Sequence, residues 1–233
     1  MNNLNTFDFQ DKKFLLLGEI HGVKENIGTL KLLVGSCLNK DDSRLVIAFE
    51  WPAELTGEIN DYLKGKVKLN WRKWNFVKYR DGRISKEHLK FLNWIKKINL
   101  KIPENKKIKI QCFDVSAKKW NTRDEKMARI LLRAGKGKKN KVIAIMGNFH
   151  AQKEPFFMNT KKHVPLGTHL PKRATSNIKL EYLSGYFFNE KLKRFPPIKN
   201  IKKIPISSFQ KIKESGYDYV FYIKKANPIS LLL

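Results

Sequence analysis

The chain has 233 residues, which is enough for one α/β domain with a sizeable core. It contains no uninterrupted apolar run of about 18 residues, so its composition argues against a membrane-spanning helix. The net charge of +27 favours anionic partners, but 39 of the 48 basic residues are lysine (48 less 9 arginines). Because base-reading proteins depend on the arginine fork, we expect a generally basic surface and favour nucleic-acid binding less.

Residues 1–5 lack the basic and then apolar pattern of a signal peptide, so we expect a cytoplasmic protein. The two cysteines, Cys37 and Cys112, have no CxxC partner. They are expected to be reduced, buried thiols.

Strands and helices alternate along the first 150 residues. Short apolar runs predict buried parallel strands at 14–17, 45–49, 108–113 and 142–146. Apolar residues at helical spacing predict helices over 26–38, from Pro52 to Leu63, and from Ser85 to Ile95. The sequence from Thr122 to Glu125 predicts a capping box at the start of a further helix, which Gly135 would end.

After residue 150 the alternation stops. Strand patterns recur at 178–188 and 217–223 without full-length crossover helices, so we expect them to extend the sheet in antiparallel fashion. The predicted fold class is α/β, with a mostly parallel central sheet flanked by helices and antiparallel C-terminal additions. We expect a single domain over 1–233, with its core at 13–151 and a C-terminal extension at 152–233.

The segment 66–84 is rich in aromatic and basic residues, among them Trp71 and Arg80. It is expected to form a lid over an anionic or planar ligand, to be a platform for single-stranded nucleic acid, or to pack its tryptophans on the core.

Each predicted parallel strand runs into polar residues at its carboxyl end. These residues are Glu19 and His21, then Glu50, then Asp114, then Asn148 and His150. Taken singly, each has a structural explanation, such as a helix cap at Asp114. Because helical crossovers bring the carboxyl ends of parallel strands to one edge of a sheet, we expect all of them in one cleft.

Two mechanisms use these residues. In the first, Glu19, His21, Glu50 and His150 hold Zn, Mn, Co or Fe, whose bound water is the nucleophile. In the second, a carboxylate orients His21, which takes a proton from water, while His150 or Arg123 stabilises the developing oxyanion. The sequence leaves both open. Candidate substrate-binding residues are Asp114, Asn148, Trp71, Arg80 and His169.

At these positions the sequence resembles the erythromycin esterase/ChaN-like superfamily, which is grouped with the TIKI and TraB proteins. The matching pieces lie at 18–22, Glu50, Arg123-Asp124 with Met127-Ala128, and 147–151. The resemblance implies an α/β core with its site at the strand ends, and esterases with a histidine base, metal-dependent peptidases or haem-associated proteins as relatives. It supports the following site residues: Glu19, His21, Glu50, Arg123 and His150.

The sequence therefore predicts a hydrolase that cleaves an ester, amide or related bond of a small molecule or peptide. One alternative is a non-catalytic protein that binds a metal, haem or an anionic ligand. The other is a nucleic-acid-associated protein.

Overall fold

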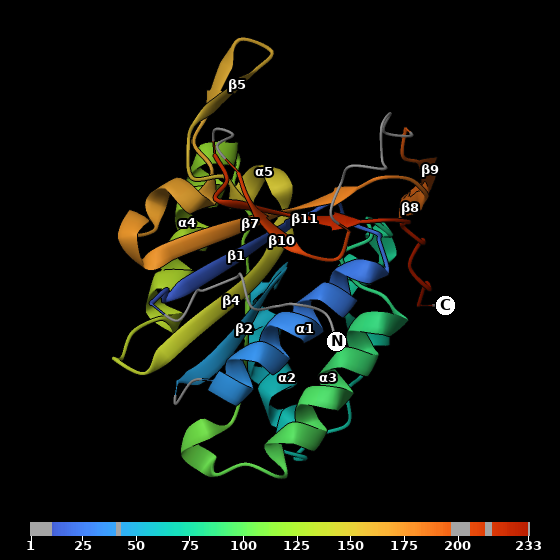
Figure 1. Ribbon diagram of the computed structural model, residues 1–233. Coiled ribbons are helices and arrows are strands. Elements are labelled where there is room, and N and C mark those ends of the chain that lie inside the picture. The colour runs from blue at the N-terminus through green and yellow to red at the C-terminus, as the bar shows by residue number, and fades with distance from the viewer. Residues whose placement is uncertain (1–10, 41–42, 197–205, 213–215, 233) are drawn as a thin grey trace.

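A computed structural model describes residues 11–40, 43–196, 206–212 and 216–232 of the protein. Its central feature is a seven-stranded sheet with the order β10-β11-β7-β1-β4-β2-β3 (Figure 1). All neighbouring pairs are parallel except β10 and β11. The strands are β1 (Phe14–Glu19), β2 (Arg44–Pro52), β3 (Lys109–Asp114), β4 (Asn140–Gly147), β7 (Thr175–Tyr182), β10 (Phe209–Lys211) and β11 (Tyr219–Ile223). The predicted fold class is confirmed.

Helices cover both faces of the sheet. The helices are α1 (Glu25–Lys40), α2 (Thr56–Leu63), α3 (Lys86–Asn99), α4 (Trp120–Ala134) and the short α5 (Asn148–Ala151). Figure 1 shows α1, α2 and α3 grouped on one side of the sheet and α4 on the other. Along β1, Leu15 and Leu17 pack with the α1–α3 side, whereas Leu16 packs with the α4 side. Because both faces are covered, the strand reads as a continuous apolar run.

The C-terminal region differs from the expectation in one respect. Strands β7 and β11 join the sheet in parallel, and the antiparallel additions are β10 and two hairpins. The hairpins are β5–β6 (Phe156–Met158 and Lys161–His163) and β8–β9 (Tyr186–Asn189 and Lys191–Arg194). Two parallel strands of one sheet need a long connection. Here α5, the β5–β6 hairpin and two 3₁₀ turns connect β4 to β7, which lie on either side of β1.

The predicted capping box at Thr122 is wrong. Helix α4 begins at Trp120, two residues earlier, and its cap residue Lys119 makes no side-chain capping bond. The Ser85 cap is confirmed, since its side chain accepts the His88 backbone N–H. Neither Cys37 nor Cys112 is in a disulfide, and both are buried.

Strand β3 forms one edge of the sheet, and helix side chains bond its outward backbone groups. Asn99 pairs with both the N–H and the C=O of Ile108, and Asn60 does the same for Ile110. The Thr56 hydroxyl does so for Cys112. These side chains replace the hydrogen bonds that another strand would make.

The segment 66–84 is irregular, with 3₁₀ turns at Trp71–Lys73 and Asn75–Tyr79. Trp74 and Phe76 are buried and contact the Trp51 ring, with centroids 5.9 Å away in both cases. The segment therefore packs aromatic side chains on the core. No helix among the residues described has the length and apolar character to cross a bilayer. Residues 1–5, on which the cytoplasmic prediction rests, lie outside the described residues.

Candidate active site

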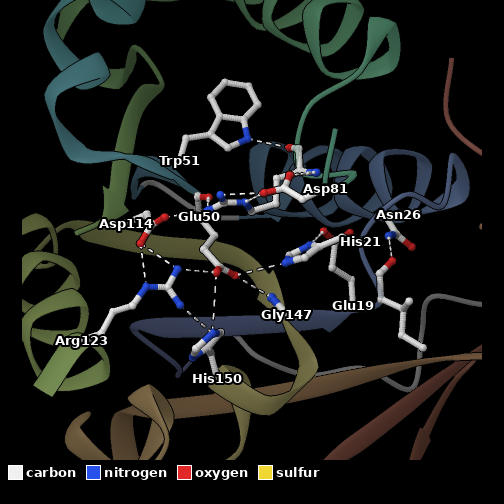
Figure 2. Close-up of polar contacts among 12 residues, drawn as sticks. Glu19, His21, Asn26, Glu50, Trp51, Asp81, Asp114, Arg123, Gly147 and His150 are labelled. Atoms are coloured by element: carbon white, nitrogen blue, oxygen red, sulfur yellow. Dashed lines mark hydrogen bonds and ion pairs between the residues drawn. The ribbon is translucent and has the colours of Figure 1, made fainter. Parts of the chain in front are cut away.

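The carboxyl ends of the parallel strands bring their polar residues together, as the topology requires (Figure 2). Strand β1 ends in Glu19, with His21 just beyond it, and β2 and β3 supply Glu50 and Asp114. His150 lies on α5, directly after β4, and Arg123 reaches in from the first turn of α4. The contacts below join these six residues into one cluster.

The Glu50 carboxylate is the centre of the cluster. Its Oε1 accepts a hydrogen bond from Arg123 Nη2 at 2.9 Å, and its Oε2 accepts the Gly147 N–H at 2.8 Å. His21 Nε2 and His150 Nε2 each lie 3.6 Å from one of its oxygens. Burial alone would raise the pKa of Glu50, but the nearby His150, His21 and Arg123 charges and the Gly147 N–H lower it to about 2. Glu50 is therefore ionised.

His21 is oriented by Glu19, whose Oε1 lies 2.8 Å from His21 Nδ1. Burial favours the neutral ring, but the hydrogen bond to Glu19 and the Glu50 charge outweigh it and raise the pKa of His21. Burial also raises the pKa of Glu19, although His21 opposes this. Asn26 supports the segment by donating to the Ile20 carbonyl at 3.0 Å. The ring is thus held by Nδ1, with Nε2 directed at Glu50.

His150 lies against Asp124, in a close charge contact whose geometry is not that of a hydrogen bond. His150 Nδ1 lies 2.7 Å from Asp124 Oδ1, and the Asp124 side chain is fully buried. The other Asp124 oxygen accepts the Leu166 N–H at 3.0 Å and the Trp120 indole N–H at 3.3 Å. The Trp120 ring also packs on the imidazole, with centroids 5.2 Å apart. The start of α4 thus fixes the second imidazole.

Two arginines offset the buried carboxylates. Arg123 donates to Asp114 Oδ1 through Nε at 2.9 Å, in addition to its contact with Glu50. Arg83 lies 2.5 Å from Asp114 Oδ2 and bonds Asp81 at 2.8 Å. Burial opposes the charge of both guanidinium groups, but their carboxylate partners raise both pKa values. The grouped acids are therefore compensated by fixed positive charge.

A cleft of about 540 Å³ opens beside this cluster. Phe76 and Tyr79 from the 66–84 segment line it. Its polar lining combines two acids, two arginines and a serine: Glu54, Asp114, Arg83, Arg123 and Ser116. A much smaller cavity of about 10 Å³ lies against Glu19, His21, Glu50 and Arg83. Arg83 thus lines both spaces.

Two glycines make the close approach at the site feasible. A Cβ on Gly147 would lie 3.3 Å from His21 Nε2 and 3.7 Å from Glu50 Oε2. A Cβ on Gly18 would lie 2.5 Å from the Tyr217 hydroxyl, which bonds the Asn148 carbonyl. Neither glycine has a positive φ, so backbone conformation does not require glycine at these positions. The lack of room for a Cβ does.

The other predicted ligand contacts lie away from the cleft walls. Trp71 is partly buried against the core, with the Arg72 guanidinium over its ring. Arg80 lies over the Phe188 ring on the β8–β9 hairpin. His169 lies in a 3₁₀ turn and is absent from the contacts that join the cluster. Asn148 begins α5 and contributes its backbone carbonyl to Tyr217.

Sequence reasoning missed three members of the site. Asp124 adjoins Arg123 in the quoted motif, but its contact with His150 crosses 26 positions of sequence. Arg83 and Asp81 both lie in the basic and aromatic segment 66–84, whose composition singles out neither of them. The alternation of acid and base in Asp81-Gly82-Arg83 was the available signal.

The donor set does not fit a metal ion. Both Glu50 oxygens already accept hydrogen bonds from protein groups, and Arg123 Nη1 lies 3.1 Å from His150 Nε2. The guanidinium thus occupies the space between Glu50 and His150 that a bridging cation would need. Within the described part of the chain, no group of three or more His, Cys, Asp or Glu side chains could hold a metal.

Solved structures share this arrangement of strands and helices. One is a succinoglycan biosynthesis protein, with 12% identity, a TM-score of 0.75, and coverage of 96% of this chain and 90% of that one. A protein from Bacillus cereus has 11% identity and a TM-score of 0.65, covering 100% and 94%. A mutant of the erythromycin esterase EreC in its open conformation has 12% identity and a TM-score of 0.68, covering 96% and 93%.

The fold and the strand-end cluster define an α/β protein whose candidate site lies at the carboxyl edge of its sheet. More narrowly, the chain shares the fold of these solved structures, the erythromycin esterase among them, as its motifs predict. No family model matches the sequence, and no curated protein matches it.

Proposed function

We propose that the protein is a hydrolase that cleaves an ester, amide or related bond with a water molecule activated by His21. One observation carries the proposal: His21 is hydrogen-bonded at Nδ1 to Glu19, and its Nε2 and that of His150 each lie 3.6 Å from the shared Glu50 carboxylate. Orientation by an acid is what a histidine base needs in order to accept a proton at a fixed atom. The erythromycin esterase with the same fold supports the ester as the bond class to test first.

His21 is the general base in this proposal. Glu19 holds the proton of the neutral ring on Nδ1, so Nε2 is free to accept a proton from water. The Glu19 carboxylate then stabilises the imidazolium that forms. Because its neighbours raise the pKa of His21, activity should rise with pH through a value above 6.5.

Arg123 stabilises the negative charge that develops on the substrate oxygen. Asp114 and Glu50 fix the guanidinium, and His150 Nε2, 3.1 Å from Arg123 Nη1, accepts a hydrogen bond from it, so the guanidinium does not need to reorganise during the reaction. Glu50 remains ionised and keeps the cationic groups in place. The cleft, lined by Glu54, Arg83 and Arg123, favours a substrate with polar groups, and Phe76 and Tyr79 form its apolar wall.

The test uses p-nitrophenyl acetate, p-nitrophenyl butyrate and an aminoacyl p-nitroanilide as probes. We expect hydrolysis by the wild type and a loss of about 10²-fold or more in kcat for His21→Asn. His169→Asn is the matched control, because His169 takes no part in the cluster, and it should keep the wild-type rate. If the wild type hydrolyses none of these probes, the proposal is wrong.

Chelator dialysis, with and without added Zn, Mn, Co or Fe, tests the metal-assisted alternative. We expect unchanged rates, because Arg123 and the Gly147 N–H already use the Glu50 oxygens. Activity that disappears on dialysis and returns with one metal would replace the His21 mechanism by a metal-bound water. A haem absorption band in the purified protein would instead favour a binding role.

A further inference from the structure

A third imidazole, that of His88, lies against the candidate site. It lines the cavity of about 10 Å³ together with Glu19, His21, Glu50 and Arg83. That volume is on the order of the room that one water-sized group needs. His88 comes from α3, which none of the strand-end motifs includes, and its side chain is 3% exposed.

The orientation of the ring is fixed. Ser85 Oγ lies 2.9 Å from His88 Nδ1, and Ser85 itself is fully buried. The Phe49 and Trp51 rings flank the imidazole, with centroids at 5.8 Å and 5.5 Å. Among the described residues, Nε2 has no hydrogen-bond partner, so it is the polar atom that His88 offers to the cavity.

The tautomer of His88 depends on where Ser85 donates its single hydrogen. The Ser85 hydroxyl oxygen accepts the His88 backbone N–H, as the cap of α3. Its own hydrogen has two acceptors nearby, His88 Nδ1 and the Glu87 carboxylate. Donation to Nδ1 leaves the ring proton on Nε2, which is the tautomer that the role below requires.

His88 is also uncharged at neutral pH. Burial lowers the pKa of His88 to about 3, and the adjacent His21 acts in the same direction. A neutral ring can therefore stay beside His21 and Arg83 without electrostatic repulsion, and it does not compete with His21 as a base.

We propose that His88 is a further catalytic residue of this site, which donates a hydrogen bond from Nε2–H to the reacting oxygen in the small cavity. The inference rests on the proposed function. The reacting oxygen is that of the scissile group or of the tetrahedral intermediate, and His88 transfers no proton. A neutral imidazole can stabilise a developing oxyanion in this way, as a donor of fixed geometry.

Two variants separate this role from a structural one. His88→Asn keeps a polar atom near the Nδ1 position, facing Ser85, and removes the group at Nε2. His88→Gln places an amide nitrogen near the Nε2 position. With p-nitrophenyl acetate, we expect His88→Asn to lose roughly 10²-fold in kcat with KM within about twofold, and His88→Gln to regain at least about tenfold of that loss. Urea unfolding shows whether both variants fold.

A wild-type kcat in His88→Asn, or equal losses in the two variants, would overturn the role of His88 while leaving His21 chemistry intact. If the wild type hydrolyses no probe, the proposed function fails, and the donor is still tested by nitrogen NMR of the wild-type ring. We expect the neutral Nε2–H tautomer from about pH 5 to pH 8. A proton on Nδ1, as when Ser85 donates to Glu87 instead, or a charged ring in that range would refute the inference.

Discussion

Helix α4 carries ion pairs on two faces with opposite surroundings. On the inner face, Arg123 lies 2.7 Å from Asp114 and 2.9 Å from Glu50, whose side chain is 5% exposed. On the outer face, Arg129 lies 2.5 Å from Glu125, and these side chains are 65% and 45% exposed. We expect the shorter pair to be the weaker one, because it is exposed and water screens it. Distance alone therefore does not rank the ion pairs of this protein.

Removing the centre of the inner cluster should have the largest effect. Glu50→Ala leaves Arg123, His21 and His150 buried without their shared acid, and we expect a loss of about 3–5 kcal/mol in the free energy of unfolding. Urea denaturation measures it. Glu50→Gln keeps the shape and an acceptor for the Gly147 N–H, so it should lose less. A Glu50→Ala midpoint equal to that of the wild type would show that the inner pairs are no stronger than the outer pair.

Acid should weaken the inner cluster without any substitution. The pKa of Glu50 is about 2 in the folded state against an ordinary 4.5, so its contribution is complete above about 4.5 and is lost as the pH falls towards 2. This amounts to roughly 2 kcal/mol by about pH 3. Neutral His88 adds a loss from about pH 6.5 down to 3, since its pKa is lowered to about 3.

Urea midpoints between pH 7 and pH 3 test this pH dependence. The wild type should become steadily less stable, and Glu50→Gln should show a shallower slope below pH 4.5. Equal slopes in the two proteins would mean that Glu50 is not held ionised by its neighbours.

The candidate site also differs from the protein surface in how tightly its atoms are packed. In Gly147→Ala the new Cβ would lie 3.3 Å from His21 Nε2, so we expect a loss of about 1–2 kcal/mol and a kcat about tenfold lower. Gly57→Ala on α2 is the matched control, because nothing lies within 4 Å of the new Cβ and alanine favours the helix. Thermal unfolding and p-nitrophenyl acetate kinetics measure both variants. If Gly147→Ala and Gly57→Ala have similar stability and similar kcat, the packing around Gly147 is not tight.

The smallest effect belongs to the outer face of α4. Replacing Arg129 by Gln should cost less than about 0.5 kcal/mol, and the cost should shrink in high salt. Urea midpoints at low and high salt check this, with Glu125→Gln as the partner variant. A loss above about 1 kcal/mol would remove the contrast between the faces.

The sequence predicted the elements that obey simple periodicity. The apolar runs at β1, β2, β3 and β4 located the strands, and their polar ends located Glu19, His21, Glu50 and His150. The topology rule for parallel strands was then enough to bring these residues together. Their roles in catalysis stay predictions.

The rest depended on contacts that the sequence does not display. The sequence predicts the start of α4 at Thr122, but the helix begins at Trp120. The Trp120 indole packs beside His150 and bonds Asp124. The predicted strand at 178–188 divides into β7 and β8, because the chain turns between them at Gly185, whose φ is +110°. Local propensity could not foresee either event, since partners distant in sequence decide both.

The side-chain hydrogen bonds along edge strand β3 affect how the protein behaves in a crowded solution. A neighbouring chain can lengthen a sheet only where main-chain donors and acceptors are unoccupied, which is the first step of fibril growth. At Ile108, Ile110 and Cys112 those groups are already satisfied by Asn99, Asn60 and Thr56. Two amides and one hydroxyl thus give this margin of the molecule resistance to self-association that charge alone would not provide.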